Sequence, residues 1–174
     1  LSRDEVLKKY GLSDTKKTVA LLPGSRESEL HALLPILADS AQRIHDRIGN
    51  VQFLVSKHPG RALSLYETPF KGRAFDYRII EGDLHNMVAA SDFAIVASGT
   101  ATLETTIIGT PYILIYKASL LTYLLYKIVA TIPFLGIANI VAKKTVAPEF
   151  LQFNATPEKI GGAAAELLGN PARL

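Results

Sequence analysis

The sequence contains no cysteine, which excludes disulfide bridges, a thiol nucleophile and metal sites with cysteine ligands. No uncharged apolar run reaches the ~20 residues that a membrane-spanning helix needs. The four histidines are dispersed without the spacing of metal ligands, so no metal site is expected. The P-loop pattern and the G-x-G-x-x-G fingerprint are also missing, which argues against ATP hydrolysis and dinucleotide redox chemistry.

An excess of charge of one sign is missing as well. The net charge is only +3 and the basic residues are scattered, so no nucleic-acid partner is expected. At 174 residues, of which 48% are hydrophobic, the chain can bury the core of one domain. It begins with Leu1, and the following Ser2-Arg3-Asp4-Glu5 has the pattern of a helix start, so we expect a segment of a longer, intracellular polypeptide.

Apolar, β-branched runs alternate with helical patterns along the chain. Buried strands are expected at residues 18–22, 51–56, 77–81, 93–97 and 112–116. Helices are expected at residues 29–48, 84–90, 101–108 and 157–168, and a loop with a short helix at residues 57–73. Pro35 predicts a kink or a short first helix in the longest of these. The alternation predicts a Rossmann-like three-layer α/β/α domain with a mostly parallel sheet.

The first expected strand ends in the turn Pro23-Gly24-Ser25-Arg26. Glycine allows close approach of a ligand to the backbone, the serine hydroxyl can donate a hydrogen bond, and arginine supplies a planar positive fork. This set suits a phosphate oxygen or a polarised carbonyl group of a ligand. A plain strand-to-helix turn with a solvated arginine has the same pattern.

A second turn, Ser98-Gly99-Thr100, follows the fourth expected strand and leads into a helix that carries Glu104. Two hydroxyls, a glycine and a helix N-terminus together favour a phosphate, and Glu104 is placed to accept hydrogen bonds from a sugar. Helix capping by Ser98 or Thr100, and a favourable charge for Glu104 in the first turn, are the alternatives. Two such turns in one α/β unit predict a nucleotide diphosphate site.

Few other side chains are candidates for a catalytic or binding role. His58 lies in a loop after the second expected strand and can line the same site. The chain has no defensible Ser-His-Asp set and no aspartate pair with the D-x-D spacing of many metal-dependent glycosyltransferases.

Several stretches of the chain together match one known pattern: residues 21–26 with Glu29, 87–92, 97–104, 109–111, 121–125, 138–140, 146–152 and 155–158. The Leu-Thr-Tyr-Leu-Leu element at residues 121–125 and the Pro-Glu-Phe-Leu-Gln element at residues 148–152 are the most discriminating, because other nucleotide-sugar enzymes share the Ser-Gly-Thr element. With these stretches, the chain resembles the lipid-A-disaccharide synthases, a family of GT-B glycosyltransferases.

The resemblance implies that residues 1–174 are the C-terminal, UDP-sugar-binding half of such an enzyme, without its N-terminal acceptor domain and terminal helices. Enzymes of this family transfer diacylglucosamine from a UDP-linked donor to diacylglucosamine 1-phosphate, with inversion and without a metal or cofactor. The general base is then outside this chain, and the chain alone is expected to be inactive. Its own N-terminal domain is the expected protein partner, and the resemblance leaves pairing with a second copy of the chain open.

The same resemblance implies roles for individual residues. Ser98, Gly99 and Thr100 are expected to hold the diphosphate, together with Gly24 and Ser25 of the first turn. Arg26 is expected to contact the diphosphate or to stabilise the developing charge of the leaving group, and Glu104 is expected to bind the ribose. The expected nucleotide contacts further along the chain are Asn139 and Gln152. Where the family has Asn-x-x-Ala-Gly-Arg, this chain has Lys143-Lys144 after the alanine, which changes the local loop and one basic contact.

Residues 112–141 are mostly apolar and aromatic, interrupted by Lys117, Lys127, Pro133 and Gly136. Residues 119–130 are expected to form an amphipathic helix suited to a membrane interface, with core packing as the alternative. Because the implied substrates carry acyl chains, peripheral binding to the cytoplasmic face of the inner membrane is expected.

Two other functions fit the pattern. One is another GT-B or epimerase-type UDP-sugar enzyme, which would leave the apolar helix without a purpose. The other is a non-catalytic nucleotide-binding module, which would bind UDP and transfer nothing.

Overall fold

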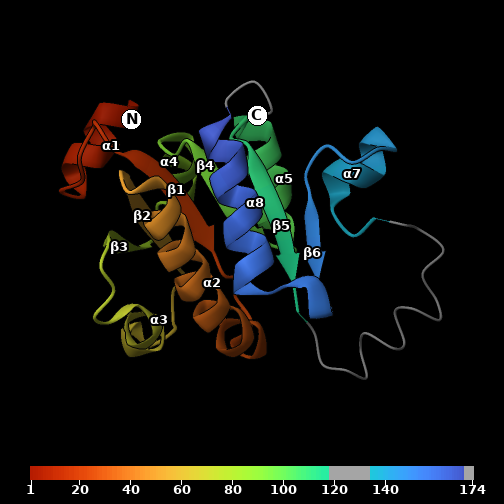
Figure 1. Cartoon of the computed structure of the whole chain (residues 1–174), viewed down its shortest axis with the longest axis horizontal. Coiled ribbons are helices and arrows are strands. Elements are labelled where there is room, and N and C mark those ends of the chain that lie inside the picture. The colour runs from red at the N-terminus through yellow and green to blue at the C-terminus, as the bar shows by residue number, and fades with distance from the viewer. Residues whose placement is uncertain (118–133, 171–174) are drawn as a thin grey trace.

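The computed structural model describes residues 1–117 and 134–170, and the helix expected at residues 119–130 lies outside this part. Six strands form one sheet in the order β3-β2-β1-β4-β5-β6, and all five strand pairs are parallel (Figure 1). The predicted Rossmann-like architecture is therefore confirmed. The strands are β1 (Lys17–Leu22), β2 (Val51–Lys57), β3 (Asp76–Glu81), β4 (Phe93–Ala97), β5 (Tyr112–Tyr116) and β6 (Glu149–Leu151).

Helices cover both faces of the sheet because alternate strand residues point to opposite sides. Val19 and Leu21 of β1 belong to one buried cluster, whereas Ala20 and Leu22 belong to the other. The first cluster lies under α2 (Glu27–Ile48), α3 (Leu63–Phe70) and α8 (Pro157–Gly169). The opposite side carries α4 (Leu84–Ala89), on which α1 (Arg3–Lys9) packs, and α5 (Thr100–Ile108), on which α7 (Ile137–Ala142) packs. The core is thus divided into two apolar layers by the sheet.

Helix α2 continues through Pro35 as one helix of 22 residues. Of the two predicted outcomes, the short first helix is therefore wrong, and the kink stays a prediction. Proline in a helix interior costs about 3 kcal/mol through the lost hydrogen bond and a steric clash. Leucines on both sides of Pro35 are fully buried against the sheet, and burial of each contributes about 1.5–3 kcal/mol. The buried stripe therefore outweighs the cost of the proline.

The sequence prediction missed α7, β6 and the short 3-10 turn at Gln152–Asn154. β6 has three residues, which is too short for a periodic pattern, and it forms only through pairing with β5, where Tyr116 aligns with Leu151. Its existence depends on a neighbour that is distant in the sequence.

The contact between α2 and α8 depends on glycine. A Cβ atom on Gly161 of α8 would lie 2.9 Å from Cβ of Arg43 and 3.0 Å from the backbone oxygen of Ser40, both on α2. The next residue, Gly162, has no heavy atom within 4 Å of the same position. The two helices therefore approach closely at Gly161 and leave room at Gly162.

We expect opposite effects from alanine at these two neighbouring positions. Gly162→Ala should raise the free energy of unfolding by about 0.5–1 kcal/mol, because alanine favours the helix. Gly161→Ala should lower it by about 1–3 kcal/mol, because the added methyl group forces two packed helices apart. Urea denaturation of both variants measures this difference, and a gain in stability for both would contradict the close packing.

Candidate functional site

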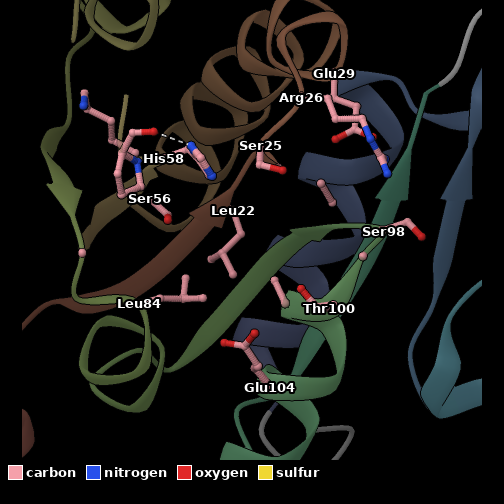
Figure 2. Close-up of a pocket in the computed structure, with 17 residues that line it drawn as sticks. Leu22, Ser25, Arg26, Glu29, Ser56, His58, Leu84, Ser98, Thr100 and Glu104 are labelled. Atoms are coloured by element: carbon pink, nitrogen blue, oxygen red, sulfur yellow. Dashed lines mark hydrogen bonds and ion pairs between the residues drawn. The ribbon is translucent and has the colours of Figure 1, made fainter. Parts of the chain in front are cut away.

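A pocket of about 490 Å³ lies at the carboxyl edge of the sheet, where the two predicted turns meet. β1 and β4 are neighbours there, and their helices leave toward opposite faces, which is the usual place for a ligand in such a sheet. Figure 2 shows Arg26 and Glu29 at one end and Glu104 at the other, with Ser25 and Thr100 between them in this view. The lining comprises Leu22, Gly24, Ser25, Arg26, Glu29, Ser56, Lys57, His58, Pro59, Gly82, Leu84, Ala97, Ser98, Gly99, Thr100, Ala101 and Glu104.

The β1–α2 turn needs glycine at position 24. Gly24 has φ +93°, and a Cβ atom there would lie 2.8 Å from Oε2 of Glu29. Arg26 donates from its guanidinium to Oε1 of Glu29 at 2.7 Å, and this hydrogen bond raises the pKa of Arg26. The carboxylate is buried, with 11% of its side chain exposed, whereas the arginine side chain is 77% exposed. Glu29 thus fixes an arginine that still faces solvent.

The β4–α5 turn presents two hydroxyls without an internal partner. Within the described residues, the hydroxyls of Ser98 and Thr100 make no hydrogen bond. Three other threonines of α5 donate to backbone carbonyls one turn earlier: Thr102, Thr105 and Thr106. The helix cap is Gly99 and lacks a side-chain cap bond, so the structure does not support the capping alternative. Ser98 and Thr100 are therefore available to a ligand.

Glu104 reaches the pocket from the second turn of α5 and is held by a residue that the sequence analysis assigned no role. Its Oε2 lies 2.9 Å from Nε2 of His85 on α4. The two residues are 19 positions apart, and only the packing of α4 against α5 brings them together. No local sequence pattern contains this contact.

The wall opposite the turns comes from the ends of β2 and β3. His58 lines the pocket, as the sequence suggested. Lys57 also lines it and pairs with Glu81, its register partner on β3, with only 10% of the lysine side chain exposed. The sequence analysis missed Lys57, because a lysine at a strand end is ordinary until its partner strand is known.

Asp83 fixes the loop that carries two further lining residues, Gly82 and Leu84. Its carboxylate accepts hydrogen bonds from Lys9 and Tyr10 of the first helical segment and from Asn86. Lys9 contributes most to lowering the pKa of Asp83 to about 2. The N-terminal helix therefore holds one wall of the pocket in place.

Asn139 and Gln152 do not line this pocket. Asn139 is 1% exposed, and its amide uses its full capacity inside the protein. Nδ2 donates to the Ala147 oxygen and to Glu149 Oε1, and Oδ1 accepts from the backbone nitrogens of Val146 and Ala147. Gln152 is 6% exposed, and its φ of 51° is unusual for a residue other than glycine. Their binding roles stay predictions, and the contacts of Asn139 are structural.

Lys143 ends α7 in the left-handed conformation, with φ 54°. The resemblance described above implies glycine at this position. A left-handed residue other than glycine costs about 1–2 kcal/mol, because its Cβ approaches a carbonyl oxygen. The loop therefore keeps the backbone shape that glycine favours, even though the residue is lysine.

Two structural findings concern metals and membranes. The described residues contain no group of three or more His, Asp or Glu side chains arranged to hold a metal ion. Among residues 1–117 and 134–170, no helix has both the length and the apolar character needed to cross a bilayer.

The match to a family model and the matches to curated relatives agree on one family. The model of the family described as Lipid-A-disaccharide synthetase matches residues 2–173. The chain is 45% identical over 177 residues to the lipid-A-disaccharide synthase of Syntrophus aciditrophicus, covering 99% of this chain and 45% of that protein. It is 36% identical to the enzyme of the same name from Nitrosococcus oceani, covering 99% of this chain and 44% of that protein.

A solved structure shows the same fold at low sequence identity. It is titled as a putative UDP-N-acetylglucosamine 2-epimerase from Listeria monocytogenes and has a TM-score of 0.62 and 16% identity. The match covers 97% of this chain and 39% of the other.

Replacement of Asn139 should affect folding. Asn139→Ala leaves several buried polar groups without partners, so it should lower the free energy of unfolding by about 3 kcal/mol. Asn154→Ala, at an exposed asparagine, should change it by less than about 0.5 kcal/mol. Urea denaturation of the two variants tests the assignment, and equal stability of both would contradict it.

Replacement of Lys143 by glycine should stabilise the chain. Lys143→Gly removes the left-handed strain and should raise the free energy of unfolding by about 0.5–1 kcal/mol. Lys144→Gly is the matched control, because Lys144 has no positive φ and gains nothing from glycine. A chemical denaturation series in which Lys144→Gly stabilises as much as Lys143→Gly would rule out this explanation.

Proposed function

This chain belongs to the lipid-A-disaccharide synthetase family, and we propose that it is the nucleotide-sugar-binding half of a glycosyltransferase that makes the lipid A disaccharide. The chain spans about 45% of the length of the curated relatives it matches. The main support for the proposal is that both turns and Glu104 line one pocket at the carboxyl edge of the sheet.

The pocket suits each part of UDP. The second turn offers the free hydroxyls of Ser98 and Thr100 and the accessible backbone of Gly99. These groups lie at a helix N-terminus, which favours binding of the diphosphate. Gly24 and Ser25 supply the facing turn. Glu104 supplies a carboxylate that accepts hydrogen bonds from the two ribose hydroxyls, in exchange for or beside its contact with His85.

The proposed reaction transfers diacylglucosamine from UDP to the 6-hydroxyl of diacylglucosamine 1-phosphate, with inversion. The bond between the anomeric carbon and the UDP oxygen breaks, and a bond from the acceptor oxygen to that carbon forms. The acceptor proton leaves to a general base outside this chain. Negative charge grows on the leaving diphosphate, and Arg26 stabilises it as a fixed positive group.

No metal or cofactor has a role in this proposal, because Arg26 and the helix N-terminus supply the positive charge for the leaving group. The acceptor site and the general base are assigned to the enzyme's N-terminal domain, so this chain alone should bind the donor and transfer nothing. Pairing with a second copy of the chain stays open.

We also propose peripheral binding to the cytoplasmic face of the inner membrane. The acylated substrates support it, as does the predominance of apolar and aromatic residues between positions 112 and 141.

Calorimetric titration of UDP into the chain tests the site. Glu104→Ala and Arg26→Ala should each weaken UDP binding about tenfold, since each removes hydrogen bonds that involve a charged group. The controls are Arg47→Ala and Glu67→Ala, which remove the same charges from exposed positions outside the pocket and should leave the affinity unchanged. No UDP binding by the parent chain, or equal loss in the controls, would contradict a nucleotide site across the two turns.

A further inference from the structure

Glu29 is an unexpected lining residue for a pocket that accepts an anion. Its carboxylate is negative and mostly buried, with 11% of the side chain exposed, and it lies beside the turn that would hold a phosphate. A carboxylate there repels a diphosphate. The ion pair with Arg26 gives a partner to only one of the two carboxylate oxygens of Glu29, Oε1.

The two oxygens have different surroundings. Oε1 accepts the hydrogen bond from Arg26 at 2.7 Å. Oε2 lies over Gly24, 2.8 Å from the place where a Cβ atom would be, and accepts no hydrogen bond within the described residues. Glu29 therefore presents a free, charged acceptor at the pocket, and the missing side chain of Gly24 leaves it uncovered.

The position of Glu29 along the pocket identifies the group it would meet. A nucleotide sugar is linear, with the ribose on one side of the diphosphate and the transferred sugar on the other. Glu104 lies at one end of the pocket, and Arg26 and Glu29 lie at the other, with Ser25 and Thr100 between them in this view (Figure 2). If the ribose is at Glu104, the sugar leaves the diphosphate toward Glu29.

We propose that Glu29 is a binding residue for the transferred sugar, with Oε2 accepting a hydrogen bond from a sugar hydroxyl or amide N–H while Oε1 holds Arg26. This inference rests on the proposed function, because it takes the direction of the ligand from the ribose at Glu104. The Glu29 carboxylate then has two tasks. One oxygen orients Arg26 at the diphosphate, and the other binds the sugar that is attached to the diphosphate. A sugar with a donor at this position gains affinity over UDP alone.

The test compares UDP with UDP-N-acetylglucosamine, a water-soluble UDP-hexosamine, by calorimetric titration of the whole chain. In Glu29→Gln, the amide oxygen can still accept from Arg26, and the amide nitrogen replaces the free acceptor. The ratio of UDP-sugar affinity to UDP affinity should fall about tenfold, as expected for one hydrogen bond to a charged group. UDP affinity in the same variant serves as the reference for the ratio, because loss of the charge both relieves the repulsion of the diphosphate and weakens the contact with Arg26. A urea denaturation midpoint equal to that of the parent chain shows that the variant is folded.

Glu27→Gln is the matched control, because Glu27 lies in the same helical turn, is exposed, and pairs with Arg61 outside the pocket. It should leave both affinities unchanged. An unchanged ratio in Glu29→Gln, or an equal loss of UDP and UDP-sugar binding, would overturn the role of Glu29 and leave the proposed function standing. Failure of the parent chain to bind UDP would instead overturn the proposed function, and this inference with it.

Discussion

The parallel pairing of β1 with β4 is the constraint on which the rest of the site depends. Leu22 aligns with Val96, so the two strands end side by side and their turns begin together. The contact is close, since a Cβ atom on Gly24 would lie 3.5 Å from Cβ of Ala97. Because parallel strands present their carboxyl ends at one edge, two motifs more than 70 positions apart in the chain become the two sides of one pocket.

A second feature of this edge of the sheet is electrostatic. Each carboxylate at or beside the pocket has a basic side chain as its partner. Such pairing lowers the free energy of keeping ionised groups in a partly desolvated space. It also means that an anionic ligand must share or exchange these partners. Arg26 can do so because its side chain is mostly exposed, whereas Lys57 is mostly enclosed. The ion pairs are Arg26 with Glu29, Lys57 with Glu81, and Lys9 with Asp83, and the partner of Glu104 is the ring nitrogen of His85.

The region around α7 shows how a motif residue can serve the fold. Asn139 ties α7 to the approach to β6, and Glu149 accepts from the backbone nitrogens of Leu135 and Gly136 at the start of the same helix. These bonds organise a short helix and a three-residue strand that lack strong periodicity of their own. A polar side chain in a family motif is therefore not by itself evidence of ligand contact.

The sequence by itself determined the local elements: strand runs such as residues 93–97, the buried stripe of α2, and the two glycine turns, because each is encoded by periodicity or by a residue with special backbone freedom. Tertiary structure alone decided the continuity of α2 through Pro35, the pairing of His85 with Glu104, and the enclosure of Asn139. Those outcomes depend on packing energies and strand order between residues far apart in the chain, and no local pattern contains them.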